Sequence, residues 1–342
     1  MKEFIMSIKQ ISYCDKVTIV LPVHNEEANL LRLIQEIDAC FQSDAEIRTL
    51  PYLLFVDDGS SDGSLECIRT AISERGHASC LRFSRNFGHQ AAVMAGISYA
   101  PENSIVVVMD SDGQDPPIIA LDLVHHVMNG ADVAYGVRWR REGRNWIKRF
   151  AYWSFYRLLS SLSIIKIPLD AGDFCAYSPR TIKILSQLKE KHPYIRGLRA
   201  WIGLNQVGVP YKRPERYAGQ ASYNFRGLFK LAFDGILSFS VKPLRLSIAL
   251  GFITFFICLF LGVFYLTAYF YDWHFSGLRM RDIPGFTTLI LMILATSSLQ
   301  MLMLGVIGEY LGRLFEESKG RPLFIIAETL GNLNRGKSQG ND

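Results

Sequence analysis

The chain has 342 residues, a formal net charge of +5, a hydrophobic content of 49% and a mean hydropathy of +0.14. Soluble enzymes of this size usually have a negative mean hydropathy, so part of the chain is expected to lie in a lipid bilayer. The modest charge gives no indication of a nucleic-acid partner. The 6 cysteines form no CxxC pair and no metal-ligand spacing, which indicates free thiols in a reducing compartment.

The first part of the chain alternates between strand-like and helix-like segments. After a leader at 1–15, β-branched and apolar runs predict strands at 17–23, 52–56, 80–83, 105–108 and 132–136, each followed by a helix or a turn. This order predicts an α/β fold with a doubly wound, mostly parallel, Rossmann-like sheet. The first strand is followed by no GxGxxG motif, and no Walker loop is present, which weakens dinucleotide and NTPase interpretations.

The strand at 105–108 leads into an unusually acidic segment. Asp110, Asp112 and Gln114 alternate along the chain, so an extended backbone would direct all three side chains toward one point. Carboxylate and amide oxygens suit a hard divalent cation, Mg²⁺ or Mn²⁺. Asp115 precedes Pro116 and Pro117 and is predicted to be the N-cap of the next helix. The alternative to the metal site is a solvated acidic turn that caps this helix. We favour the metal site, because open α/β sheets bind ligands at the carboxyl ends of their strands.

Another strand that ends in acidic residues lies earlier in the chain. Asp57 and Asp58 follow the strand at 52–56 and open the turn-rich segment DDGSSDGS. Alone, this pair is consistent with a simple turn before a helix. Two acidic strand ends in one sheet instead favour a nucleotide diphosphate site, where one carboxylate contacts base or ribose and a metal neutralises the phosphates.

The composition changes after the sheet. Cations and aromatic residues alternate at about 145–162 and again at 223–245, a pattern typical of amphipathic helices in a membrane interface; charged, solvated helices are the alternative. Between them, residues 170–175 read as a β-turn from their spacing alone.

Two long apolar runs follow, at 246–271 and 286–311. Each exceeds the about 20 residues that a helix needs to cross a bilayer, so two transmembrane helices are predicted. Lysine and arginine residues concentrate on their outer flanks, which places the catalytic domain, both termini and the tail at 313–342 in the cytoplasm of a plasma-membrane protein.

The chain contains seven short motifs in this order: PVHNEE (22–27), VDDGSSDGS (56–64), RNFGHQAAVMAG (85–96), DSDGQDPP (110–117), GDF (172–174), GQASY (219–223) and LGVIGEYLGR (304–313). Together they resemble the polyprenyl-phosphate glycosyltransferases of glycosyltransferase family 2, over residues 16–325. The resemblance implies a GT-A catalytic domain at 16–222 and inverting transfer of one sugar from a nucleotide sugar to a membrane polyprenyl phosphate. By family frequency, UDP-glucose and undecaprenyl phosphate are the first choices, and a homo-oligomer, a tetramer, is expected.

The resemblance also implies roles for individual residues. The metal and diphosphate site would comprise Asp110, Asp112 and Gln114, and the nucleotide contacts would be Pro22, Asn25, Glu27, Asp57 and Asp58 together with Asp110. The acceptor phosphate would meet Arg138 and Arg141, and Asp173 would be an active-site acid, either a base or a positioning group. The chain departs from the family pattern at two positions. Gly113 stands where the family often has a small apolar residue or leucine, and Cys175 stands where it often has an arginine. Both departures leave the identity of the donor sugar open.

Three alternatives remain. The donor sugar can be an aminoarabinose derivative, N-acetylglucosamine or mannose. A processive polysaccharide synthase shares the acidic motifs but usually carries a QxxRW motif and more membrane helices. Residues Leu198 to Trp201 resemble that motif only weakly. A membrane scaffold without activity has no need for acids at successive strand ends.

Overall fold

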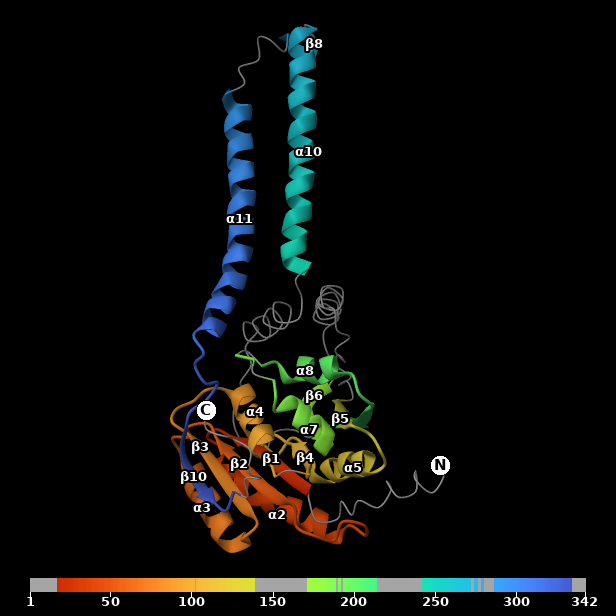
Figure 1. Ribbon diagram of the computed structural model, residues 1–342, viewed down its shortest axis with the longest axis vertical. Coiled ribbons are helices and arrows are strands. Elements are labelled where there is room, and N and C mark those ends of the chain that lie inside the picture. Colours follow the sequence, from red (N-terminus) through yellow and green to blue (C-terminus); the bar gives the residue numbers. More distant parts are fainter. Residues whose placement is uncertain are drawn as a thin grey trace. The chain divides into compact units, whose positions relative to one another are not determined.

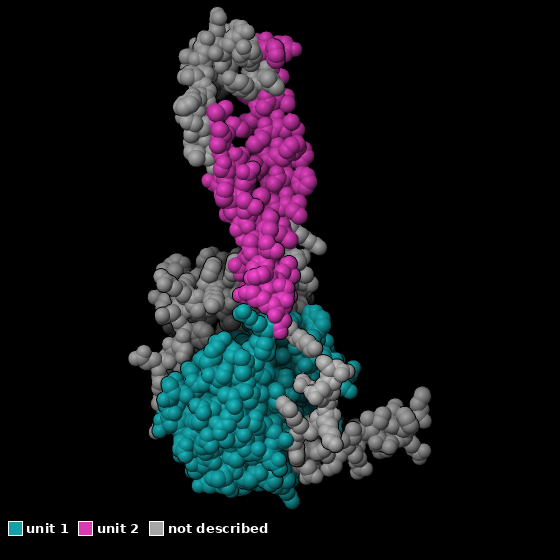
Figure 2. All heavy atoms as spheres, turned by 60° about the vertical axis from the view of Figure 1, so that its left-hand side comes forward, with its two compact units in different colours: residues 1–157, 165–229, 321–342 teal, residues 158–164, 230–320 magenta. Residues whose placement is uncertain are grey.

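The computed structural model describes residues 17–138, 171–213 and 242–333, except 102, 189, 192, 272–273, 276–277 and 280–285. The chain forms two compact units, residues 1–157, 165–229 and 321–342 in unit 1 and residues 158–164 and 230–320 in unit 2 (Figure 2). Arg141, the predicted interfacial helix at about 145–162 and most of the segment at 223–245 lie outside the described residues.

Unit 1 is built on an eight-stranded sheet in the order β10-β3-β2-β1-β4-β6-β5-β7 (Figure 1). The strands are β1 (Val17–Val23), β2 (Tyr52–Asp57), β3 (Ala78–Phe83), β4 (Ile105–Val108), β5 (Val133–Arg138), β6 (Ala171–Tyr177), β7 (Gln206–Tyr211) and β10 (Ile326–Gly331).

The sheet is mixed, which corrects the prediction of a mostly parallel one. Strands β3, β2, β1 and β4 are parallel neighbours, as are β5 and β7. Strand β6 runs antiparallel to both β4 and β5, and β10 runs antiparallel to β3. The GDF motif therefore lies within β6, beside β5, and is not the β-turn that its spacing suggested. The pairing of β6 with β5 shifts register between Tyr135 and Val137, which places an irregularity of the strand at this motif.

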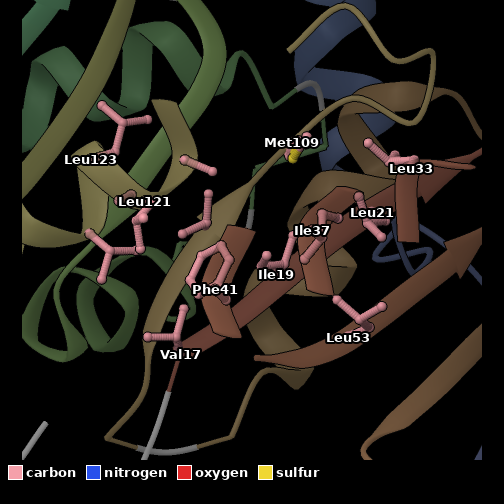
Figure 3. Packing of buried hydrophobic residues seen from close by; sticks show 14 of the residues in the cluster. Val17, Ile19, Leu21, Leu33, Ile37, Phe41, Leu53, Met109, Leu121 and Leu123 are labelled. Atoms are coloured by element: carbon pink, nitrogen blue, oxygen red, sulfur yellow. The ribbon is translucent and has the colours of Figure 1, made fainter. Parts of the chain in front are cut away.

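Helices cover both faces of the sheet. Helices α2 (Glu27–Ser43), α3 (Ser64–Arg75) and α5 (Pro117–Met128) pack on one face, and α4 (His89–Tyr99) packs on β1 and β2 from the other (Figure 1). Two short helices, α7 (Pro179–Leu185) and α8 (Ile195–Ile202), pack against β6. The helical spacing of Leu33, Ile37 and Phe41 turns one stripe of α2 onto Ile19 and Leu21 of β1 (Figure 3).

This arrangement brings the two acidic strand ends together. Because β1, β2 and β4 are parallel, their carboxyl ends share one edge of the sheet. The backbone continues the pairing past the strands: Asp58 N–H donates to the Val23 carbonyl at 2.9 Å, and Met109 N–H donates to the Val20 carbonyl at 3.1 Å. The sequence prediction that both acidic segments lie at one sheet edge is therefore confirmed.

The end of the described chain forms part of unit 1. Strand β10 extends the sheet beside β3, although the sequence assigned these residues to a tail. Glu328 forms an ion pair with Arg69, with 2.9 Å between Glu328 Oε1 and Arg69 Nη2. The Phe324 ring stacks on the Phe83 ring with centroids 5.0 Å apart. Ser84 N–H donates to the Ile325 carbonyl at 2.9 Å. Strand β10 thus covers a sheet edge that β3 would otherwise expose.

Phe324→Ala is expected to lower the thermal unfolding midpoint of the protein by a few degrees, because losing the stacked ring costs about 1–2 kcal/mol. Ile325→Ala is the matched control, since the neighbouring Ile325 side chain is exposed. Differential scanning fluorimetry in detergent checks both variants. Equal midpoints for the two variants would contradict a stabilising role for this segment.

Unit 2 contains two long helices in contact with each other, α10 (Lys242–Phe270) and α11 (Phe286–Ser318). Strands β8 (His274–Phe275) and β9 (Leu278–Arg279) pair between them. Many large apolar side chains on both helices are exposed, Phe252 and Leu302 among them. Within the described residues, the window Ser247–Phe264 is long and apolar enough to cross a membrane. The second crossing, at 286–311, stays a prediction.

Candidate active site

The loops after β1 and β2 are bound to each other by reciprocal hydrogen bonds. Asn25 N–H donates to Ser60 Oγ at 3.1 Å, and Asn25 Oδ1 accepts from Ser61 N–H at 2.8 Å. Glu27 N–H donates to Asp62 Oδ2 at 3.2 Å, while Gly63 N–H donates to Glu27 Oε2 at 2.9 Å. Asn25 and Glu27, which were predicted to contact the nucleotide, therefore fix the two loops that follow β1 and β2 through hydrogen bonds between side chains and backbone.

Asp57 and Asp58, at the end of β2, are buried. Asp58 accepts from the backbone N–H groups of Phe87 and Gly88 at 2.6 and 2.9 Å, so it fixes the loop that precedes α4. Burial raises the pKa of the Asp58 carboxyl, and the two backbone hydrogen bonds oppose that rise. Gly59 follows with φ +68°, and a Cβ there would lie 2.7 Å from the Arg85 carbonyl carbon. Only glycine permits this close approach of the two loops.

Three carboxylates gather after β4 around one arginine from the end of β7. Arg213 Nη2 lies 3.2 Å from Asp110 Oδ2 and 3.7 Å from Asp112 Oδ2, and Arg213 Nε lies 3.8 Å from Asp115 Oδ1. Gln114 N–H donates to Asp112 Oδ1 at 3.0 Å. Asp110 and Asp112 thus converge on one cation, as their spacing predicted.

Asp115 is not the helix cap that the sequence suggested. Helix α5 is preceded by Pro116 at its cap position, and the Asp115 carboxylate is buried in the cluster instead. Tyr211 O–H donates to Asp115 Oδ1 at 2.9 Å. Burial and the nearby charge of Asp110 raise the pKa of Asp115 to about 6.

Arg138 lies beside this cluster at the end of β5. Its Nε donates to Tyr211 Oη at 3.4 Å, and its guanidinium packs over Gly172. A Cβ at Gly172 would lie 3.0 Å from Arg138 Nη2, so the glycine of the GDF motif makes room for the arginine. The structure thereby connects the predicted acceptor residue Arg138 through Tyr211 to Asp115 of the acidic cluster.

Asp173, on β6, is held by cations. Arg196 of α8 donates two bonds to its carboxylate, Nε to Oδ1 at 2.9 Å and Nη2 to Oδ2 at 3.1 Å. His89 Nε2 lies 3.6 Å from Asp173 Oδ2 and 3.7 Å from Asp110 Oδ1, which connects the two acidic groups. Burial alone would raise the pKa of Asp173, but Arg196 and His89 hold it well below its usual range.

The same contacts act on His89. Burial alone would lower the pKa of this imidazole, but Asp173 and Asp110 outweigh it and raise the pKa to about 9. His89 is therefore a cation at neutral pH, at the first residue of α4.

The donor set after β4 fits a divalent metal. Asp110 and Asp112 each present an oxygen to the same guanidinium nitrogen, so one cation reaches both carboxylates. Among the described residues, no group of three or more His, Cys, Asp or Glu side chains is arranged as a metal site. Two carboxylates suit Mg²⁺ or Mn²⁺, each of which takes its remaining ligands from water and substrate phosphates.

Comparison with known proteins identifies the family. The model of glycosyl transferase family 2 matches residues 18–185. An uncharacterized glycosyltransferase of Bacillus subtilis, YkcC, is 39% identical over 325 residues, which cover 93% of this chain and 95% of that protein. The chain belongs to glycosyltransferase family 2. The bactoprenol glucosyl transferase of Shigella phage SfV is 32% identical over 315 residues, which cover 91% of this chain and 98% of that protein.

Solved structures resemble the glycosyltransferase more distantly. Glucosyl-3-phosphoglycerate synthase from Mycobacterium tuberculosis, in complex with uridine diphosphate, aligns with a TM-score of 0.45 and 18% identity, and covers 68% of this chain and 83% of that one. A likeness at this distance assigns no role to any residue. The mixed α/β sheet and the family match support the predicted GT-A-like fold of the catalytic unit.

The remaining predicted residues take different places in the glycosyltransferase. The Pro22 carbonyl accepts from Ser111 Oγ at 2.7 Å, which ties β1 to the acidic segment. Asp57 Oδ1 accepts from Ser60 N–H at 3.0 Å, and Asp57 Oδ2 lies 3.7 Å from Arg82 Nε. Pro22 and Asp57 thus hold neighbouring loop residues in place through these hydrogen bonds. Arg141 lies outside the described residues.

Sequence reasoning missed several cations of the site, Arg196, His89 and Arg213. The RNFGHQ motif contains His89 but gives no indication of its two carboxylate partners. Arg196 and Arg213 lie in segments without any recognised motif. Their roles follow from convergence of distant segments, which no local spacing encodes.

Another arginine, Arg199, contacts Cys175, where the sequence departs from the family pattern that it resembles. Arg199 is 1% exposed, and its Nη1 lies 2.7 Å from Cys175 Sγ and 3.3 Å from the Gly172 carbonyl. Its guanidinium also stacks over the Tyr135 ring at 4.3 Å. The chain thus has a buried guanidinium from α8 in contact with the Cys175 side chain.

His89→Gln is expected to destabilise the protein most near pH 6, and less as the pH rises, when measured in EDTA. The pKa of His89 in the folded protein lies above its ordinary value of about 6.5, so its ion pairs stabilise fully below pH 6.5 and are lost as the pH rises through about 9. The gap in unfolding midpoint between wild type and His89→Gln should therefore narrow from pH 7 to pH 10. His77→Gln, on the exposed surface, is the control. A gap that stays constant would show that His89 does not titrate in this range.

Proposed function

We propose that the enzyme transfers a single sugar from a nucleotide diphosphate sugar, with UDP-glucose as the first choice, to a membrane polyprenyl phosphate such as undecaprenyl phosphate. The observation that carries the proposal is the similarity to the bactoprenol glucosyl transferase of the Shigella phage, which spans 98% of that protein. The acidic groups at the carboxyl ends of β2 and β4 support donor binding at this edge of the sheet.

The acceptor phosphate is already an anionic nucleophile, so the reaction needs no strong general base. In-line attack by its oxygen on the sugar carbon inverts that carbon and releases the nucleotide diphosphate. Asp173 suits a positioning role, because a carboxylate whose pKa is held below its usual range is a weak proton acceptor. Arg138 and Arg141 are proposed to bind the acceptor phosphate.

Mg²⁺ or Mn²⁺ would be held by Asp110, Asp112 and Gln114, and would neutralise charge on the leaving diphosphate. The cationic His89, next to Asp110, adds positive potential at the same place. Asn25, Glu27 and Asp58 are proposed to shape the nucleotide pocket through the loops that they fix.

The helices α10 and α11 are proposed to cross the plasma membrane, with the catalytic unit and both termini in the cytoplasm. Exposed apolar side chains along both helices support this proposal, because a large uncovered apolar surface marks contact with lipid or with another protein. Small residues on α11, such as Ala295, Ser298 and Gly305, permit close helix packing in a homotetramer.

Sugar transfer by the full chain in detergent tests the function. The assay offers undecaprenyl phosphate with Mg²⁺ or Mn²⁺ to a panel of UDP-glucose, UDP-N-acetylglucosamine, GDP-mannose and an aminoarabinose donor. We expect one chloroform-soluble product carrying a single sugar, which EDTA abolishes. A long polymer would indicate a processive synthase, and folded protein that neither transfers sugar nor binds nucleotide would contradict the proposal.

A further inference from the structure

The most telling feature of the acidic cluster is the arginine inside it. One nitrogen, Arg213 Nη2, faces the Oδ2 atoms of both Asp110 and Asp112, at 3.2 and 3.7 Å. These two carboxylates are the ones proposed to hold the divalent ion. A metal bound between them and a guanidinium at this place would be two cations in direct contact, so the two occupants exclude each other.

The geometry of Arg213 is that of a loosely held cation. Its distances to the three carboxylates are 3.2, 3.7 and 3.8 Å, and its buried Nε makes no hydrogen bond within the described residues. Arg196, by contrast, makes two bonds of 2.9 and 3.1 Å to Asp173. Strong bonds between arginine and carboxylate are about 2.7–2.9 Å long. The structure therefore has one tightly fixed arginine, Arg196, and one that is held by longer contacts, Arg213.

The place of Arg213 in the fold favours release of its side chain from the cluster. Tyr211 anchors the end of β7 by its bond to Asp115, by the contact with Arg138 and by packing on Phe174. Arg213 lies two residues beyond this anchor, past the last residue of the strand, and its side chain is 23% exposed. The backbone near the cluster is thus fixed, while the Arg213 side chain stays partly exposed.

We propose that Arg213 is an exchangeable internal cation, which offsets part of the negative charge of Asp110 and Asp112 in the metal-free enzyme and leaves them when the divalent ion binds. The inference rests on the proposed function for the identity of the metal site. Its consequence is that the metal alone binds weakly, because it must displace a resident charge. The released guanidinium remains within reach of the anionic diphosphate or acceptor phosphate.

The test measures Mn²⁺ binding to the full chain in detergent, without nucleotide, from the electron paramagnetic resonance signal of free Mn²⁺. Arg213→Gln is expected to bind Mn²⁺ about tenfold more tightly than wild type, because a cation a few ångströms from the metal is removed. Lys212→Gln is the matched control, since it removes the same charge from the adjacent, exposed residue; its affinity should change by less than about twofold.

A second readout is thermal stability. Arg213→Gln should have a lower unfolding midpoint than wild type in EDTA, and Mn²⁺ should raise that midpoint more than it raises the wild-type midpoint. If the glutamine variant fails to fold, Arg213→Lys replaces it, because one ammonium group lacks the planar fork that faces all three carboxylates. The lysine variant should bind Mn²⁺ a few-fold more tightly than wild type.

Equal or weaker Mn²⁺ binding by the folded Arg213 variants would overturn the proposal. Sugar transfer by wild type that continues in EDTA would also overturn it, since Arg213 would then be a permanent cation. Neither result questions the glycosyl transfer itself. Conversely, an enzyme that transfers no sugar to any polyprenyl phosphate would still report on Arg213 through the Mn²⁺ titration, so the two failures are distinguishable.

Discussion

Asp112→Asn is expected to lower sugar transfer by about 100- to 1000-fold while the protein keeps its fold. The substitution removes one of the two carboxylates that converge on a single cation and leaves an isosteric amide in its place. Loss of one group that stabilises developing charge typically reduces kcat by this factor. The measurement is the initial rate of chloroform-soluble product formation at saturating metal and donor.

Asp122→Asn provides the matched control for this variant. Asp122 lies on the outer side of α5, with a half-exposed side chain that pairs only weakly with His126 at 3.9 Å. Its substitution removes the same charge from the same unit and should leave the rate within about twofold of wild type. Full activity of Asp112→Asn, with the circular dichroism spectrum of wild type, would show that the acidic cluster does not bind the donor.

Asp173→Asn is expected to reduce both activity and stability. The carboxylate is 7% exposed, and its removal leaves Arg196 and His89 without their shared counter-charge. Breaking a buried ion pair from one side costs about 3 kcal/mol or more, which corresponds to an unfolding midpoint about 6–12 °C lower. Differential scanning fluorimetry in detergent measures this shift.

A double-mutant cycle separates the pair from the individual residues. Arg196→Met alone should also destabilise, because Asp173 then loses its strongest partner. The double variant Asp173→Asn, Arg196→Met should lose less than the sum of the two single losses, since no unpaired charge of the pair is left buried. Simple additivity would mean that the two side chains act independently and that the ion pair contributes nothing.

The elements with a strong local pattern were predictable from the sequence. The apolar runs of β1, β2 and β4 and the helical stripe of α2 are local patterns, which the chain carries in each segment by itself. The carboxyl ends of the parallel strands β2 and β4 must share an edge, so the proximity of the two acidic segments was also predictable. The convergence of Asp110 with Asp112 was predictable from their spacing of two residues. The family motifs added the reaction class.

The tertiary structure decided what depends on distant segments. Strand β6 lies between β4 and β5 and turns the GDF motif into a strand, and β10 returns after unit 2 to pair with β3. Such long-range pairings leave little mark on local spacing, because any extended segment of suitable polarity can occupy a sheet edge.

The charge partners of the site follow the same rule. The sequence contains many arginines, and only the fold selects Arg196 for Asp173 and Arg213 for the acidic cluster. An ion pair forms where two side chains of opposite charge are held within a few ångströms, and that distance is a property of packing. The sequence by itself determined which residues carry the chemistry, and the tertiary structure determined which cation each carboxylate meets.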